Sequence, residues 1–129
     1  MQKIIVAFAT NDGTRLNDDH FGAAALYSIY EIDSSGYKFL KSLANSTAEE
    51  EIHADPKKAK GVSRILRDEK VIVAGSKVFG PNLQRIKQKF VCVFLQNEII
   101  EEAAGKLSEN FALIQLEWNK GEARDHLVL

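Results

Sequence analysis

The sequence has little of what a covalently cross-linked fold or a cysteine-built metal site needs. Its 129 residues include one cysteine, Cys92, which excludes an intramolecular disulfide and an all-cysteine zinc or iron-sulfur site within one chain. Two prolines and eight glycines are too few for a fibrous or low-complexity chain. These shortages favour a globular protein of a reducing compartment, and we expect it in the cytoplasm.

Charge of one sign and long apolar runs are also missing. Lys and Arg number 17 against 18 Asp and Glu, so the formal net charge of -1 gives no overall attraction to nucleic acid or to an anionic membrane. The apolar run at 4–9 is too short for a secretory leader, and nothing approaches the roughly 20 apolar residues that span a bilayer. We expect neither a nucleic-acid partner nor a membrane location.

What is present is a regular succession of strand and helix patterns, which predicts one domain over residues 1–129. Its core is expected at about 1–116, with a loose polar tail after Trp118. Buried or hairpin strands are predicted at 3–9, 26–32, 37–43, 71–75 and 91–95, and a short edge strand at 111–116. Helices are predicted from Asp55-Pro56, from Gly80-Pro81-Asn82 with Leu83, Ile86 and Phe90 inward, and from Asn97 as an N-cap.

This order of elements predicts an α/β fold. The two strand-helix-strand units should be right-handed parallel crossovers, which gives a five-stranded mixed sheet in the order 3-2-1-4-5 with helices on both faces. Ligands of such sheets bind beyond the carboxyl ends of the strands where the strand order reverses. Here that point lies between the strands at 3–9 and 71–75.

Two loops with glycines and polar groups should therefore meet at this point. The first carries Asn11 and Asp12 and runs into His20-Phe21-Gly22; the second carries Gly75 and Gly80-Pro81-Asn82. Free N–H groups of a helix that begins at Pro81 could bind an anion. The alternatives are structural: the glycines and Pro81 make a tight connection, and Asn11 and Asp12 form an ordinary turn.

These motifs together resemble a known family. The N-terminal strand, His20-Phe21-Gly22, the strand at 71–75 and Gly80-Pro81-Asn82 are similar in order and position to the dinitrogenase iron-molybdenum cofactor biosynthesis family, also called nitrogenase accessory factors. The resemblance covers about residues 1–107. It implies a three-layer α/β/α fold with a ribonuclease-H-like motif, and a non-catalytic role in binding or carrying iron-molybdenum cofactor, its precursors or related iron-sulfur clusters.

The same resemblance assigns roles to individual residues. His20 matches the family histidine proposed to contact the cluster, Phe21 and Gly22 complete its motif, and Gly80, Pro81 and Asn82 match the second loop. Many members also have a His-Gly pair at the start of the helix after the third strand, where this chain reads Lys58-Ala59-Lys60-Gly61-Val62 and His53 lies several residues earlier. His53 is therefore a second, weaker candidate metal ligand beside His20.

Each candidate has a structural alternative. His20 could bond loop backbone and fix the turn, His53 could be a solvated loop histidine, and Cys92 is expected to be a buried core residue. The helix predicted from residue 56 carries several basic residues that could meet an acidic partner or RNA, although a charged helix face is usually only solvated: Lys57, Lys58, Lys60, Arg64 and Arg67.

Two other function classes compete with a cluster carrier. A metal-dependent hydrolase would need carboxylates on the central strands, where this chain has alanines and valines, so we expect no enzyme. A metal-free module that binds a small anion or a protein partner remains the alternative. A single histidine holds a cluster weakly unless a second chain, an exogenous thiol or backbone N–H groups at the Pro81 helix supply the rest, so the chain could be a monomer or a homodimer. A cluster-assembly or delivery protein could be a further partner.

Overall fold

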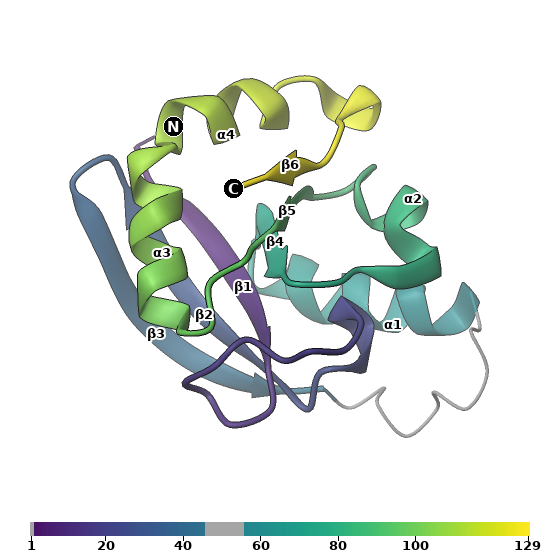
Figure 1. Cartoon of the computed structure of the whole chain (residues 1–129). Helices are drawn as coiled ribbons and strands as arrows, with labels where there is room; N and C mark the ends of the chain where they lie inside the picture. Colours follow the sequence, from purple (N-terminus) through teal and green to yellow (C-terminus); the bar gives the residue numbers. More distant parts are fainter. Residues whose placement is uncertain (1, 46–55) are drawn as a thin grey trace.

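The computed structural model describes the backbone of residues 2–45 and 56–129, and the side chains of 2–45 and 61–129. Its described strands form one six-stranded sheet in the order β3-β2-β1-β4-β5-β6 (Figure 1). The strands are β1 (Ile4–Thr10), β2 (Leu26–Asp33), β3 (Gly36–Ala44), β4 (Val73–Ser76), β5 (Val91–Phe94) and β6 (Leu127–Val128). The helices are α1 (Pro56–Asp68), α2 (Leu83–Ile86), α3 (Ile100–Glu109) and α4 (Phe111–Trp118).

The predicted strand order is confirmed, with one strand added at the edge. β1 pairs antiparallel with β2 and parallel with β4, so the direction of pairing changes at β1. β2 and β3 form the predicted hairpin through the turn at Asp33–Gly36, and β5 runs parallel to β4. The α/β class and the mixed sheet are therefore confirmed.

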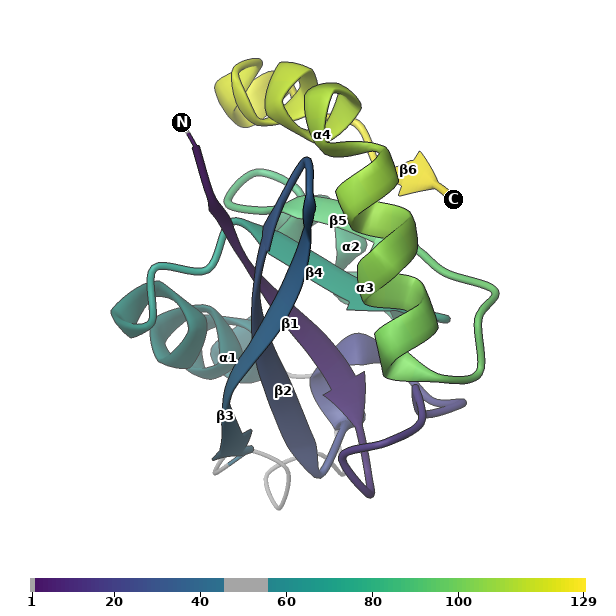
Figure 2. The ribbon, with the colours of Figure 1, turned by 90° about the vertical axis from the view of Figure 1, so that its left-hand side faces the viewer.

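Successive side chains of β1 point to opposite faces of the sheet, and the core accordingly consists of two clusters, one on each face. Val6 and Phe8 point to the face covered by α3 and α4, while Ala7 and Ala9 point to the face covered by α1 and α2. Figure 2 shows α3 crossing one face of the sheet, with α1 on the other side. All four side chains are fully buried, as expected for a central strand. That this arrangement is a ribonuclease-H-like three-layer fold stays a prediction.

The prediction for the C-terminal part was wrong in two respects. Residues 111–116 are not an edge strand but belong to α4, because the run lacks the alternation of a strand and a helix places Ile114 in the core, with no exposed area. The tail after Trp118 is not loose. It forms a 3-10 turn, η4 (Gly121–Ala123), and then β6, which pairs in parallel with β5.

Two helix starts also differ from the prediction. At Gly80 the chain forms a 3-10 turn, η3 (Gly80–Asn82), followed by α2, which is only four residues long, so little helix dipole is available there. Asn97 does not cap α3; Ile99 is the N-cap residue, without a side-chain bond. None of the helices in the described part of the chain has the length and apolar character needed to cross a membrane.

Candidate functional site

The loops that follow β1, β4 and β5 meet at the carboxyl ends of these strands. His20 and Val78 form a parallel backbone bridge between the first two loops. Leu16 N–H donates to the carbonyl of Glu98 at 3.0 Å, which attaches the loop after β5 to the first. The convergence predicted at the switch point is therefore present, and it includes a third loop that sequence reasoning did not place there.

Lys77 links all three loops by charge. Its Nζ lies 2.9 Å from a carboxylate oxygen of Asp18 and also contacts Glu98. Hydrogen bonds to these two carboxylates raise the pKa of Lys77. Lys77 was not among the predicted site residues, because its partners lie far away in the sequence.

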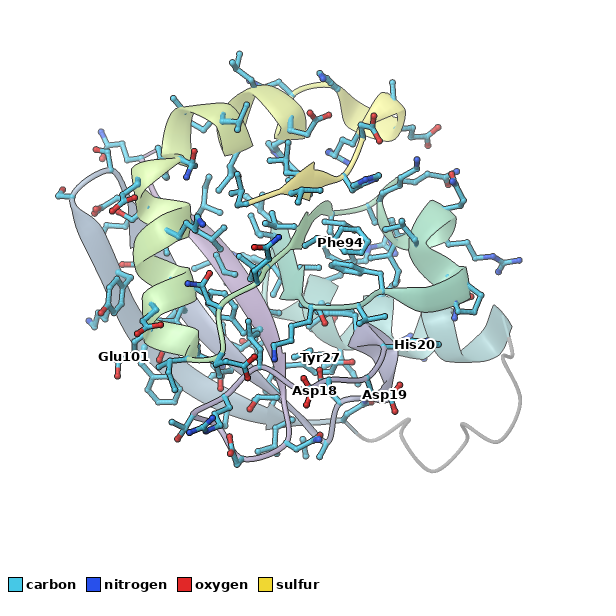
Figure 3. The ribbon with its side chains drawn as sticks, viewed as in Figure 1. Asp18, Asp19, His20, Tyr27, Phe94 and Glu101 are labelled. Carbon is cyan, nitrogen blue, oxygen red and sulfur yellow. The ribbon has the colours of Figure 1, made fainter. Side chains whose placement is uncertain are left out.

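His20 and Gly80 are in direct contact across the first two loops. A Cβ atom added to Gly80 would lie 2.5 Å from His20 Nδ1, and Gly80 has φ +75°, a conformation that favours glycine. Nδ1, Cγ and Cε1 are the ring atoms of His20 nearest this glycine, and the role of His20 as a metal ligand stays a prediction. His20 itself is exposed at the start of the 3-10 turn η1 (Phe21–Ala23), and Figure 3 shows it beside Asp19. Pro81 is exposed and Asn82 half-buried in η3.

The buried side chain of Phe21 attaches the loop that carries His20 to the core. It is fully buried, and its ring stacks on Phe79 with centroids 5.4 Å apart and tilts against Tyr27 at 5.0 Å. Tyr27 Oη–H donates to the carbonyl of Phe21 at 2.9 Å, and burial raises the pKa of Tyr27, so this donor stays protonated. Phe21 thus positions His20 instead of facing a ligand.

Asn45 holds the other side of the same loop. Its Nδ2 donates to the carbonyls of Gly22 and Ala24, both at 2.9 Å. These bonds join residues more than 20 positions apart, and the sequence signal for them is only an asparagine directly after an apolar strand. Sequence reasoning therefore missed Asn45, although it fixes the predicted residue Gly22.

The side chains of Asn11 and Asp12 accept hydrogen bonds from nearby backbone N–H groups. Asn11 Oδ1 accepts from Ala25 N–H at 3.0 Å. Asp12 Oδ1 accepts from the N–H groups of Thr14 at 2.8 Å and Arg15 at 2.9 Å, in an ordinary Asx turn. These bonds favour the structural alternative for both residues, and a ligand role for them stays a prediction.

The Asp12 turn should respond to acid. The backbone N–H of Arg15, and then that of Thr14, lower the pKa of Asp12 from its ordinary value of 3.8. A carboxyl group with a depressed folded-state pKa contributes stability above the unfolded-state pKa and loses it as the pH falls through the folded-state value. We expect the amide NMR signals of Thr14 and Arg15 to titrate with a midpoint below 3.8.

The variant Asp12→Asn is the control for this titration. It keeps a side-chain oxygen as acceptor but has no carboxyl proton, so the two amide signals should lose their pH dependence. A midpoint in the natural protein at or above the ordinary carboxyl value would contradict the assigned hydrogen bonds.

Gly75 has a packing explanation. It is buried, and an added Cβ would lie 3.0 Å from Phe8 Cδ1 and 3.1 Å from Leu95 Cδ1. The glycine therefore leaves room above β4 for the side chains of Phe8, from β1, and of Leu95, which follows β5. Its predicted contact with a ligand is not needed to explain it and stays a prediction.

Two buried amides near this edge lack partners in the described part of the chain. Asn17 is 5% exposed, and neither its Nδ2 nor its Oδ1 has a hydrogen-bond partner there; the same holds for Asn97 Oδ1. Leaving a buried polar group unsatisfied costs about 1–3 kcal/mol, so a water molecule or a polar ligand group at this position would be favoured. Asn17 was missed because the sequence shows only an asparagine in a polar loop.

The donors for a metal are few. No group of three or more His, Cys, Asp or Glu suited to a metal ion occurs within the residues that the structure describes. Cys92 is buried as predicted, and burial raises the pKa of its thiol to about 12, which disfavours the thiolate form at neutral pH. His53 lies outside the described residues. Among the described residues, His20 is therefore the one predicted metal ligand, and it lies where the loops after β1 and β4 meet.

Comparison with known proteins agrees with the motifs. Residues 2–110 match the model of the dinitrogenase iron-molybdenum cofactor family, and the chain belongs to this family. A search among curated proteins found no match. Membership connects the chain with iron-molybdenum cofactor, and the match includes the His20 loop and the Gly80 loop.

Proposed function

We propose that the protein is a non-catalytic carrier that binds iron-molybdenum cofactor, one of its precursors or a related iron-sulfur cluster at the crevice between the loops after β1 and β4. The family match supports the nature of the cargo. The observation that carries the location is the exposed His20 imidazole, which is held against Gly80 where the two loops meet.

The residues around His20 would position its imidazole as a metal ligand. The other coordination sites of the metal would stay open for further donors. Phe21 and Asn45 fix the loop backbone from within, so the imidazole is presented with little loss of conformational freedom. A neutral imidazole is a suitable ligand for iron at neutral pH. The remaining donors would come from a second copy of the chain, from a small thiol or from a delivery protein.

A metal-free binding module is the second candidate function. The absence of a three-donor cluster among the described residues favours it, as do the unpartnered amide atoms of Asn17 and Asn97. In that case a small polar or anionic ligand, or a protein partner, would occupy the same crevice. His20 would then hydrogen-bond the ligand instead of coordinating a metal.

The test is an anaerobic titration of the metal-free protein with iron-molybdenum cofactor and with simple iron-sulfur clusters. Binding is measured by absorbance and by comigration in gel filtration, which also gives the oligomeric state. We expect saturable binding that weakens at least about tenfold, or 1.4 kcal/mol, in His20→Asn. The matched control is His126→Asn, another exposed histidine, which should bind as the natural protein does.

Two results would contradict the carrier function. Absence of binding to the natural protein favours the metal-free module. Equal binding to the natural protein and to His20→Asn removes His20 from the site, whatever the cargo.

A further inference from the structure

A basic pocket lies at the opposite end of β4 and β5 from the candidate site. Its volume is about 440 Å³. It is formed where α1 leads into β4, where α2 leads into β5, and where α4 ends, so residues distant in sequence build it together. The side chains of Ile72, Phe90 and Trp118 give it an apolar part.

The charges of the lining all have the same sign. Arg67, Lys70, Lys89 and Arg124 line the pocket, and no Asp or Glu does. Within the described chain, no ion pair involves any of these four residues. The nearby acid Glu117 is bound elsewhere: its Oε1 accepts from Lys120 and its Oε2 from the backbone N–H of Asp125. In a chain of net charge -1, this concentration of uncompensated positive charge is a local feature.

Arg124 is the fixed member of the group. It is only 8% exposed, and its guanidinium lies 4.0 Å from the centre of the Trp118 ring. Nε–H donates to the carbonyl of Trp118 at 3.0 Å and Nη1–H to that of Gln88 at 2.8 Å. Guanidinium has five N–H groups, so Nη2 still has both of its donors available among the described residues.

The setting of Arg124 favours an anion in the pocket. Burial lowers the pKa of Arg124, which means that the surroundings penalise its charge, yet an arginine remains protonated at neutral pH. Two carbonyl oxygens and the negative charge of nearby Glu117 compensate that charge only in part. An oxyanion that accepts hydrogen bonds from Nη2 would balance the remaining positive charge of Arg124. The flexible side chains of Arg67, Lys70 and Lys89 would add further positive charge around this oxyanion.

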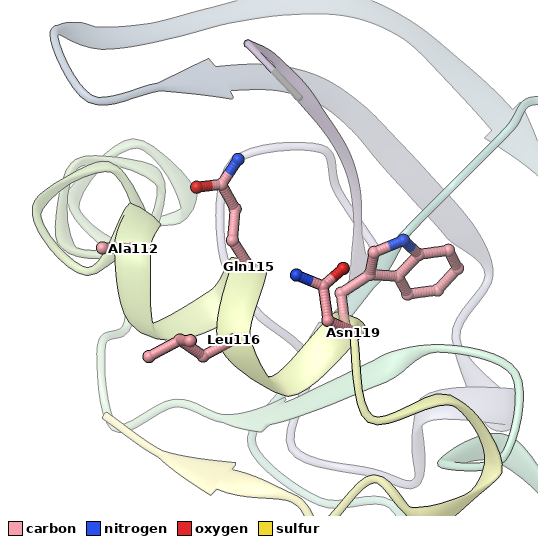
Figure 4. A pocket seen from close by; sticks show the side chains of 5 residues that line it. Ala112, Gln115, Leu116 and Asn119 are labelled. Carbon is pink, nitrogen blue, oxygen red and sulfur yellow. The ribbon is translucent and has the colours of Figure 1, made fainter.

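We propose that this pocket binds a small, multiply charged oxyanion of the phosphate-ester or pyrophosphate type. The site is separate from the crevice at His20 and does not depend on the proposed carrier function. A second pocket, of about 380 Å³ and without charged lining residues, has Trp118 in its lining as well. Figure 4 shows the side chains that line this second pocket. An uncharged group attached to the anion would have to reach it past the Trp118 side chain.

The single tryptophan of the chain gives a direct measurement. Trp118 lines both pockets, so a change in the tryptophan fluorescence reports on this region of the chain. Titration with inorganic pyrophosphate should change this fluorescence saturably, beyond the change caused by sodium chloride of the same ionic strength. A parallel titration with ADP distinguishes the sources of the phosphate: equal affinity indicates recognition of the anion alone, and tighter binding of ADP indicates use of the adjoining pocket.

Variants of the lining residues test whether the fluorescence change comes from binding in this pocket. The double variant Lys70→Gln/Lys89→Gln changes exposed side chains and should fold normally while weakening pyrophosphate binding about tenfold. Lys106→Gln, an exposed lysine of α3, is the matched control and should leave the affinity unchanged. Arg124→Gln should weaken binding further, but its loss of buried bonds makes the double variant the decisive one.

The proposal is overturned by either of two results. One is a fluorescence response that sodium chloride reproduces. The other is an affinity for pyrophosphate that is equal in the natural protein and in the double lysine variant.

Discussion

Replacing Phe79 by alanine is expected to lower the free energy of unfolding by about 3–5 kcal/mol, the range for a large aromatic side chain removed from a core. Phe79 is 1% exposed and lies between two other rings, with centroids 5.4 Å from that of Phe21 and 4.9 Å from that of Phe94. The neighbouring backbone is tied to the His20 loop, so the cavity cannot collapse without moving the site. Urea unfolding with an unchanged m value measures the loss.

The matched control is Phe39→Ala on the edge strand β3. Phe39 is 51% exposed, and the centroid of its ring lies 5.5 Å from that of Tyr30. Removing this side chain should therefore lower the free energy of unfolding by only about 1 kcal/mol. Phe79→Ala should also weaken ligand binding at the crevice, because Phe21 loses its stacking partner. Similar losses of stability in the two variants would show that Phe79 is not the core residue described above.

Replacing Gly80 by alanine is expected to affect both stability and the site. A non-glycine residue at φ +75° costs about 1–2 kcal/mol, and the new methyl group would lie 2.5 Å from His20 Nδ1. The exposed imidazole can move away, so the collision should displace His20 rather than unfold the chain. We expect a loss of about 1–2 kcal/mol in unfolding free energy, shifted His20 imidazole NMR signals and cluster binding weakened at least about tenfold.

Gly121→Ala separates the two causes. Gly121 also has a positive φ, +63°, but an added Cβ would have no atom within 4 Å. This variant should lose a similar amount of stability while the His20 signals and the binding stay unchanged. If Gly80→Ala left the His20 signals in place, the contact between the two loops would be wrong.

Much of the fold could be predicted because its signals are local. The fully apolar strands β1 and β5 and the Asp-Ser-Ser-Gly turn of the hairpin are each contained in a few neighbouring residues. The prediction of a strand at 111–116 was wrong because this run is apolar on several sides: Leu113 and Leu116 are exposed although Ile114 is fully buried. Only packing against the sheet decides between strand and helix for such a run.

In the candidate site, too, features with a local sequence signal could be predicted, and features that depend on tertiary contacts could not. Strand order alone predicted that the loops of His20 and Gly80 would meet, and a backbone bridge between them is present. The contacts of Asn45 with Gly22, of Lys77 with Asp18, and the burial of Asn17 depend on which loops become neighbours after folding. Their side chains are ordinary loop residues in the sequence, and nothing in their spacing distinguishes them.

The C-terminal segment has a consequence for the edge of the sheet at β5. The family match ends at residue 110, whereas Ile114 of α4 completes the core and β6 lies along the outer edge of β5. Without this segment, the apolar strand Val91–Phe94 would be an open edge, the kind of surface on which other chains add as further strands and aggregates grow. β6 therefore covers the part of this edge at Val93 and Phe94 with a strand of only two residues, which is a much shorter template for another chain.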